Sequence, residues 1–367
     1  MYVVFGTYFL FLMFVAGGLW RWQKQTPSSR QRQHPLVSVV VAMRNEAQNL
    51  QPLLQSLQTQ TYSGPFQILL VDDHSTDNTL YVAGLLKVHF SNLKIELLAS
   101  EAAGKKQALA TGIAKAGGEI ILTTDADCEL QADWINDMVQ AFDNHTQLVV
   151  GVVKLTTNAT VWSKLQAMEF ASVIATGLGS LGWGMPLMCN GASLAFRKAA
   201  FYAVSGYKGN EHIPSGDDEF LMHKVANHFP RSVKAVPPGL NLGTTLPVTT
   251  VADFFDQRVR WAGKWRANQS GFARLLAVFI FLVQLSWWPL LAAALVTPHA
   301  GLSVVVVFKI MLELLLLLTV SFVTRQRFDV LAFACLQILY APYVLAVAVA
   351  SQLMGYSWKG RTTLPGE

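Results

Sequence analysis

The sequence predicts an α/β domain with a doubly wound, mainly parallel sheet, flanked by apolar helices that belong in a membrane. Two observations lead to this class. Short apolar runs alternate with helical patterns and turn signals from His34 to about Pro247, which is typical of strands that alternate with helices. The whole chain is 52% hydrophobic and only 14% charged, a composition too apolar for a purely soluble protein.

An uncharged apolar segment, Tyr2 to Trp20, stands at the start of the sequence. A helix of about 20 apolar residues crosses a hydrocarbon core of about 30 Å. Its positive charges follow it, from Arg21 to Arg32, whereas a signal peptide carries them before its apolar region. We therefore expect an uncleaved membrane anchor over residues 1–22 and a polar, basic linker over residues 23–33. Because Lys and Arg accumulate on the cytoplasmic side, the domain that follows is expected in the cytoplasm, at a bacterial inner membrane.

Strands and helices alternate through the first half of the predicted domain. Leucines recur after the first strand at intervals that place them on one face of a helix: Leu50, Leu53, Leu54 and Leu57. The expected strands are Val37–Val41, Ile68–Val71, Ile95–Leu98 and Ile120–Leu122, and further expected helices are Thr79–Phe90 and Lys105–Ala116. In such a sheet, ligands bind at the carboxyl ends of the strands.

Three apolar stretches follow Gly271, at about residues 272–296, 302–323 and 330–353. Their length predicts spanning or re-entrant helices. Lys309 and Glu313 stand four residues apart in the second stretch, so they share one helix face and are expected to form an ion pair.

The membrane topology of these stretches raises a conflict. Three full crossings after a cytoplasmic domain would place Lys359 and Arg361 outside, against the positive-inside rule. We therefore expect one C-terminal segment not to cross fully. The candidates are the segments interrupted by Pro289 and by Pro342, since proline removes a helix hydrogen bond.

Charge and cysteine content exclude some classes of protein. The net charge of +5 is explained by membrane topology and anionic lipid headgroups, so membrane lipids are expected partners and nucleic acid is not. The three cysteines lack metal-ligand spacing and an even count for pairing, which is consistent with a reducing compartment: Cys128, Cys189 and Cys335.

Two acidic groups follow predicted strands. Asp72 and Asp73 come directly after Ile68–Val71, and Asp125 and Asp127 come shortly after Ile120–Leu122. Both groups are therefore expected at the ligand-binding edge of the sheet. Two carboxylates separated by one residue suit a hard divalent cation such as Mg²⁺ or Mn²⁺, although most such triplets are solvated turns.

A third acidic group consists of Asp217, Asp218 and Glu219. Three consecutive acids repel one another, so a raised pKa on one of them is expected, which would suit a general base. The alternative is a helix N-terminus, whose dipole attracts acidic residues.

A cluster of basic and aromatic residues, Gln257 to Arg266, precedes the C-terminal apolar stretches. This composition is typical of a helix at a membrane interface. Arg260 has the geometry to bind a phosphate as well.

In their order along the chain, these motifs resemble family 2 inverting glycosyltransferases. The resemblance covers about Leu36 to Trp265 and rests on the opening strand Val37–Val41, Val71–Asp77, Asp125–Asp127, Gly216–Asp218 and Gln257–Trp261. The anchor and C-terminal helices resemble the membrane-bound branch that contains cellulose, chitin and hyaluronan synthases and ceramide glucosyltransferase. The resemblance implies a GT-A fold over residues 34–256, an interfacial segment over 257–270, a membrane region over 271–355 and a polar tail over 356–367.

The resemblance also implies a donor site. Asp73, with Asp72 beside it, would bind the base of a nucleotide-sugar donor, usually uracil. Asp127, aided by Asp125, would hold Mg²⁺ or Mn²⁺, and Asp125 would also border the nucleotide. Lys105, at the start of a predicted helix, would lie near the donor phosphates.

The catalytic base implied by the resemblance is Asp218, with its neighbour Asp217 as the weaker candidate. The family usually has Glu-Asp where this sequence has Asp217-Asp218. Residues expected beside the acceptor and the diphosphate are Gln257, Arg260, Trp261, Asn190 and Gly191.

The implied function is transfer of one sugar, with inversion, from a nucleotide-sugar donor to a lipid-linked or glycan acceptor at the cytoplasmic membrane face. A processive polysaccharide synthase is the alternative, because the Gln257-x-x-Arg260-Trp261 motif also occurs in processive enzymes. A catalytically inactive membrane scaffold is an alternative of another class, and its expected sign, a damaged acidic motif, is missing from this sequence.

Overall fold

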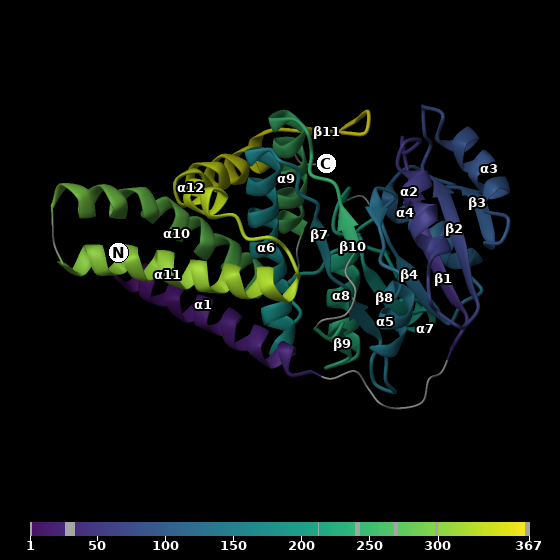
Figure 1. Cartoon of the computed structure of the whole chain (residues 1–367), viewed down its shortest axis with the longest axis horizontal. Helices are drawn as coiled ribbons and strands as arrows, with labels where there is room; N and C mark the ends of the chain where they lie inside the picture. Colours follow the sequence, from purple (N-terminus) through teal and green to yellow (C-terminus); the bar gives the residue numbers. More distant parts are fainter. Residues whose placement is uncertain are drawn as a thin grey trace. The chain divides into compact units, whose positions relative to one another are not determined.

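The computed structural model of the chain describes residues 2–25, 34–211, 213–238, 243–267, 271–297 and 300–363 (Figure 1). Residues 26–33 of the predicted linker and 364–367 of the predicted tail lie outside the described residues. The chain divides into two compact units. The helical unit comprises Met1–Trp20, Thr156–Ser180 and Pro247–Glu367, and the sheet unit comprises Arg21–Leu155 and Leu181–Leu246.

The sheet unit is built on a seven-stranded mixed sheet with the order β3-β2-β1-β4-β8-β6-β9. Its strands are β1 (Val37–Met43), β2 (Phe66–Asp72), β3 (Ile95–Ala99), β4 (Ile120–Thr123), β6 (Leu148–Val150), β8 (Leu194–Arg197) and β9 (Val233–Ala235). Strands β3, β2, β1 and β4 are parallel, whereas β8 is antiparallel to both β4 and β6. The predicted, mainly parallel sheet is therefore confirmed, with one reversed strand that the sequence did not reveal.

Helices α2 (Leu50–Gln58), α3 (Thr79–His89) and α4 (Lys105–Lys115) connect the parallel strands as expected. The four leucines of α2 are fully buried in the core beside β1 and β2. Helix α4 approaches the sheet closely at Gly112, where an added Cβ would lie 2.5 Å from Val40 and 2.9 Å from Val71. Close packing there requires a residue without a side chain.

A smaller sheet in the same unit has the order β5-β10-β7. Its strands are β5 (Cys128–Glu129), β7 (Val153–Leu155) and β10 (Gly243–Thr245), and the remaining helices of the unit are α5 (Trp134–Gln140), α7 (Lys198–Ala203) and α8 (Asp217–His228).

The helical unit contains most of the long helices: α1 (Tyr2–Gln23), α6 (Val161–Gly182), α9 (Val251–Ala267), α10 (Gly271–Val296), α11 (Ala300–Val323) and α12 (Val330–Leu353), followed by β11 (Tyr356–Trp358) and β12 (Arg361–Thr363). Both α1 and α6 run a short way into the residues of the sheet unit. By length and composition, α1, α10, α11 and α12 are long and apolar enough to cross a membrane. Helices α10 and α11 lie side by side (Figure 1).

The helical unit tests several of the sequence predictions. Helices α10 and α12 continue through Pro289 and Pro342, so neither proline breaks its helix. The predicted ion pair is confirmed, with Lys309 Nζ 2.9 Å from Glu313 Oε2. Helix α6 was not predicted, because Val161–Gly182 contains no motif and is less apolar than the candidate spans.

Candidate donor and catalytic site

The first acidic pair lies at the carboxyl end of β2. The Asp72 carboxylate accepts a hydrogen bond from the Ser75 amide at 3.2 Å and thereby shapes the turn after the strand. Asp73 is 1% exposed, and its Oδ1 accepts a hydrogen bond from the Gly104 amide at 2.8 Å. Its backbone carbonyl accepts a bond from the Arg44 guanidinium at 2.9 Å. Asp73 therefore links the ends of β1 and β2 to the start of α4.

Lys105, the first residue of α4, connects two acidic groups. Its Nζ lies 2.7 Å from Asp125 Oδ1 and 3.3 Å from Asp217 Oδ2. Burial alone would lower the pKa of Lys105, but the charges of Asp125 and Asp217 raise it instead. The ammonium group is thus held charged between the end of β4 and the start of α8.

Asp125 and Asp127 follow β4 as predicted. Burial, and next the charge of Asp125, raise the pKa of Asp127 to about 6. A buried carboxylate beside a second carboxylate gains most when a cation neutralises the pair. Among the described residues no group of three or more His, Cys, Asp and Glu side chains is placed to hold a metal ion. The two carboxylates, Asp125 and Asp127, suit a cation such as Mg²⁺, which takes one or two carboxylates and completes its shell with water and substrate phosphates.

The third acidic group opens α8, after Gly216 in the left-handed region at φ 79°. Asp218 Oδ2 accepts a hydrogen bond from the Gly191 amide at 2.7 Å, and its Oδ1 accepts one from the Glu219 amide at 2.7 Å. The predicted Asn190-Gly191 loop thus lies directly against the acidic group. A Cβ at Gly191 would lie 3.2 Å from Asp217 Oδ2, so the loop approaches closely because this residue is glycine.

A raised pKa was expected for one residue of this third group, and for Asp217 that expectation is wrong. Burial would raise the pKa of Asp217, but the charge of Lys105 outweighs it, and the pKa is lowered. The sequence reasoning counted the repulsion between neighbouring acids and missed the ammonium group that approaches them from α4. The raised carboxyl pKa falls on Asp127 instead.

Tyr207 is a neighbour of this site that the sequence did not single out. Burial, and next the charge of Asp217, raise the pKa of its phenol well above the usual value. Tyr207 therefore stays neutral beside the acidic group. A lone tyrosine outside any motif gives no sequence signal of such a position.

Gln257, Arg260 and Trp261 lie in α9 of the helical unit. Arg258 lies between them in the sequence, and its guanidinium stands 4.3 Å from the Trp261 ring centroid and contacts the Gln257 side chain. The predicted role of the three motif residues at the diphosphate and the acceptor stays a prediction.

Comparisons with known proteins show the family and the fold of this chain. The family model described as Glycosyl transferase family 2 matches residues 38–201. A beta-monoglucosyldiacylglycerol synthase of Nostoc sp. is 29% identical over 237 residues, which are 62% of this chain and 48% of that protein. A poly-beta-1,6-N-acetyl-D-glucosamine synthase of Staphylococcus epidermidis is 27% identical over 229 residues, which are 62% of this chain and 53% of that protein. The chain thus spans about half the length of these relatives.

Among solved structures, the mannosyltransferase PcManGT of Pyrobaculum calidifontis, in complex with GDP-Man and Mn²⁺, matches with a TM-score of 0.64 and 20% identity, covering 95% of this chain and 96% of that one. This match confirms the GT-A fold. A second family model, described as Glycosyl transferase family group 2, matches residues 120–350. Because that match covers more than half of the sequence, the chain belongs to glycosyl transferase family group 2.

Proposed function

We propose that the chain is an inverting glycosyltransferase that moves a sugar from a nucleotide-sugar donor to a hydroxyl group of a lipid or glycan acceptor. The observation that carries this proposal is the grouping of Lys105, Asp125, Asp217 and Asp218 beside the carboxyl ends of β2 and β4. Ligands bind at that edge of an open α/β sheet.

In the proposed reaction, Asp218 is the base. Its carboxylate takes the proton of the acceptor hydroxyl while the hydroxyl oxygen attacks the anomeric carbon, and the nucleoside diphosphate leaves from the opposite face. The two backbone amides that bond to Asp218 fix the direction of its oxygens. One displacement inverts the anomeric centre.

The donor is proposed to bind between Asp73 and Lys105. Asp73, with Asp72 shaping its turn, accepts hydrogen bonds from the base. Lys105 supplies a positive charge at the N-terminus of α4, where phosphate groups are stabilised. Asp125 and Asp127 would hold Mg²⁺ or Mn²⁺, which offsets the charge of the leaving diphosphate when it is bound.

The acceptor is proposed to be a lipid at the cytoplasmic face of a membrane. The candidate spans and two basic residues, Arg21 in the last turn of α1 and Lys24 after it, support this placement. One relative is named for a glycolipid and another for a polymer, so the length of the product distinguishes single transfer from processive synthesis.

The test of this proposal compares two neighbouring acids. Asp218→Asn removes the base and should lower sugar transfer about 10² to 10⁴-fold, while donor binding, measured by calorimetry, stays within a few-fold. Asp217→Asn is the matched control and should lower transfer less, because Asp217 pairs with Lys105. Near-normal transfer by Asp218→Asn would contradict the assignment of the base.

A further inference from the structure

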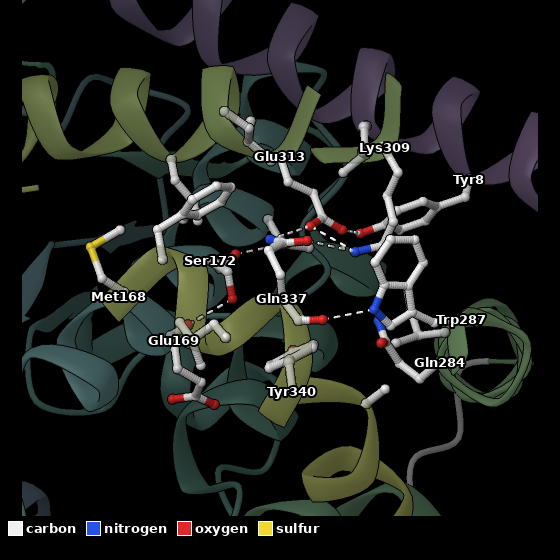
Figure 2. Close-up of a pocket in the computed structure, with 18 of the residues that line it drawn as sticks. Tyr8, Met168, Glu169, Ser172, Gln284, Trp287, Lys309, Glu313, Gln337 and Tyr340 are labelled. Carbon is white, nitrogen blue, oxygen red and sulfur yellow. Dashed lines mark hydrogen bonds and ion pairs between the residues drawn. The ribbon is translucent and has the colours of Figure 1, made fainter. Parts of the chain in front are cut away.

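The helical unit contains a pocket of about 130 Å³ between α1, α6, α10, α11 and α12 (Figure 2). All residues that line it belong to this unit. One part of its lining is apolar: Phe11, Leu12, Met168, Ile280, Leu316, Leu317, Phe333, Leu336 and Ala341. The other part is polar and is contributed by every one of the five helices: Tyr8, Glu169, Ser172, Thr176, Gln284, Lys309, Glu313, Gln337 and Tyr340. The site is therefore amphipathic.

The charges in this lining are compensated within the protein. Lys309 Nζ donates to Glu313 Oε2 at 2.9 Å and to Gln337 Oε1 at 3.2 Å. Glu313 also accepts hydrogen bonds from Tyr8 at 2.7 Å and from the Gln337 amide at 3.0 Å, as the dashed lines in Figure 2 show. Glu169 is paired with Arg258 at 2.6 Å. A charged headgroup would therefore bring an uncompensated charge into a poorly hydrated site, which is costly.

Gln284 is a polar residue of the pocket lining. Its side chain is 3% exposed, and no hydrogen bond joins its amide to another described residue. An amide that faces a poorly hydrated pocket and has no protein partner there gains free energy when a ligand bonds to it. The amide offers N–H donors and a carbonyl acceptor, which match the ester carbonyl and hydroxyl groups of an uncharged lipid.

We propose that this pocket binds one uncharged lipid of the diacylglycerol class, with its carbonyl or hydroxyl group at Gln284. The apolar lining suits the adjoining hydrocarbon. The pocket volume is about that of four water molecules in the liquid. This space holds the polar group and the first part of an acyl chain. The rest of the chain extends out of the partly open pocket. This site goes beyond the proposed function, because binding is expected whether or not the lipid is glycosylated.

The test measures binding of dioleoylglycerol to the purified full chain in phosphatidylcholine nanodiscs, by cross-linking with a photoactivatable acyl chain. Saturable labelling of the pocket helices that unlabelled dioleoylglycerol displaces is the expected result. Dioleoyl phosphatidic acid has the same chains with an added charge and should compete at least about tenfold less well. Equal competition by the two lipids, or labelling that does not saturate, would overturn the proposal.

Two variants locate the site. Gln284→Leu replaces the unpartnered amide by an apolar group of similar size and should weaken dioleoylglycerol binding about tenfold, the effect of one lost hydrogen bond in a buried site, without lowering the melting temperature. Ser172→Leu fills the pocket and should reduce saturable labelling by a similar factor. The matched control is Gln352→Leu, the same change at an exposed glutamine near the end of α12.

Binding by Gln284→Leu as tight as that of the wild type would overturn the proposal even if Ser172→Leu does not fold. The proposed function is tested separately by nucleotide binding to the same preparation. Loss of nucleotide binding with intact lipid binding counts against the function alone, and the reverse result counts against the lipid site alone.

Discussion

The Asp127 carboxylate shows how position alone changes the chemistry of a residue. Burial and the charge of Asp125 raise its pKa to about 6, so Asp127 is protonated below about pH 6 and charged above it. A cation binds the charged form and competes with the proton. The affinity of the site for Mn²⁺ should therefore depend on pH in a range where an ordinary aspartate does not titrate.

We predict that the affinity for Mn²⁺ in the presence of nucleoside diphosphate falls about tenfold for each pH unit below about 6 and levels off above it. Calorimetric titrations between about pH 5 and pH 8 measure this slope. Asp127→Asn should abolish metal binding and activity, whereas Glu96→Gln, at an exposed position of β3, should leave both unchanged. A pH-independent affinity would show that Asp127 is not a ligand.

At the scale of elements, α6 and α9 are joined by a buried ion pair. Arg258 and Glu169 have side chains that are 4% and 7% exposed, and they meet at 2.6 Å and 3.3 Å. The Tyr343 hydroxyl of α12 adds a third contact to Glu169 at 3.3 Å. The Arg258 guanidinium also lies 4.3 Å from the ring centroids of both Phe254 and Trp261. The pair thus fixes the helix that carries the Gln257-x-x-Arg260-Trp261 motif.

We predict that Glu169→Gln destabilises the helical unit by about 3 to 5 kcal/mol, because it leaves Arg258 buried without a counter-charge. The double variant Glu169→Gln with Arg258→Met should recover most of that loss. Thermal unfolding in detergent measures both, and Glu119→Gln, whose pair with Arg197 is exposed, should cost about 1 kcal/mol at most. If the single variant is as stable as the control, the pair does not hold α9.

Some features of the structure could be predicted from the sequence and others could not. Helix α2 was predicted because its four leucines share one face, and all are buried. The motifs also placed Asp73, Asp125 and Asp218 at the ends of elements, as found. The contact between Lys105 and Asp217 could not be predicted, because 112 residues separate the two in the sequence and no periodicity reports a tertiary contact. For the same reason the sequence did not reveal the pairing of Glu169 with Arg258.

At the scale of the whole chain, the two ends of α12 lie near α6 and α9. Both of these helices directly follow a strand of the sheet unit in the sequence. Asp329 caps its start and pairs with Lys164 of α6 at 2.9 Å. Helix α6 is preceded by β7 and followed by β8. After α12, the Trp358 ring lies 5.1 Å from the guanidinium of Arg260 in α9, which follows β10.

The contacts along α12 are consistent with the positions of its two ends. Its second half packs along α9 through Val259, Val347 and Ala350. A spanning helix of 24 residues is about 36 Å long and would place its two ends on opposite membrane surfaces. We infer that α12 lies along the membrane surface, while α1, α10 and α11 cross. On this inference, the segment with Pro342 is the one that we expect not to cross.

The basic residues that flank the apolar helices also favour three crossings over four. If α1, α10 and α11 cross and α12 does not, these basic residues all lie on one side of the membrane, which the positive-inside rule predicts to be the cytoplasmic side: Arg21, Lys24, Arg274, Arg325, Arg327, Lys359 and Arg361. In chains whose native cysteines are replaced, Ser357→Cys should resist a membrane-impermeant maleimide in sealed cells and react in inside-out vesicles. Asn144→Cys, exposed in the sheet unit, should behave alike, whereas Thr297→Cys, after α10, should react in sealed cells. Reaction of Ser357→Cys from outside would mean that α12 crosses.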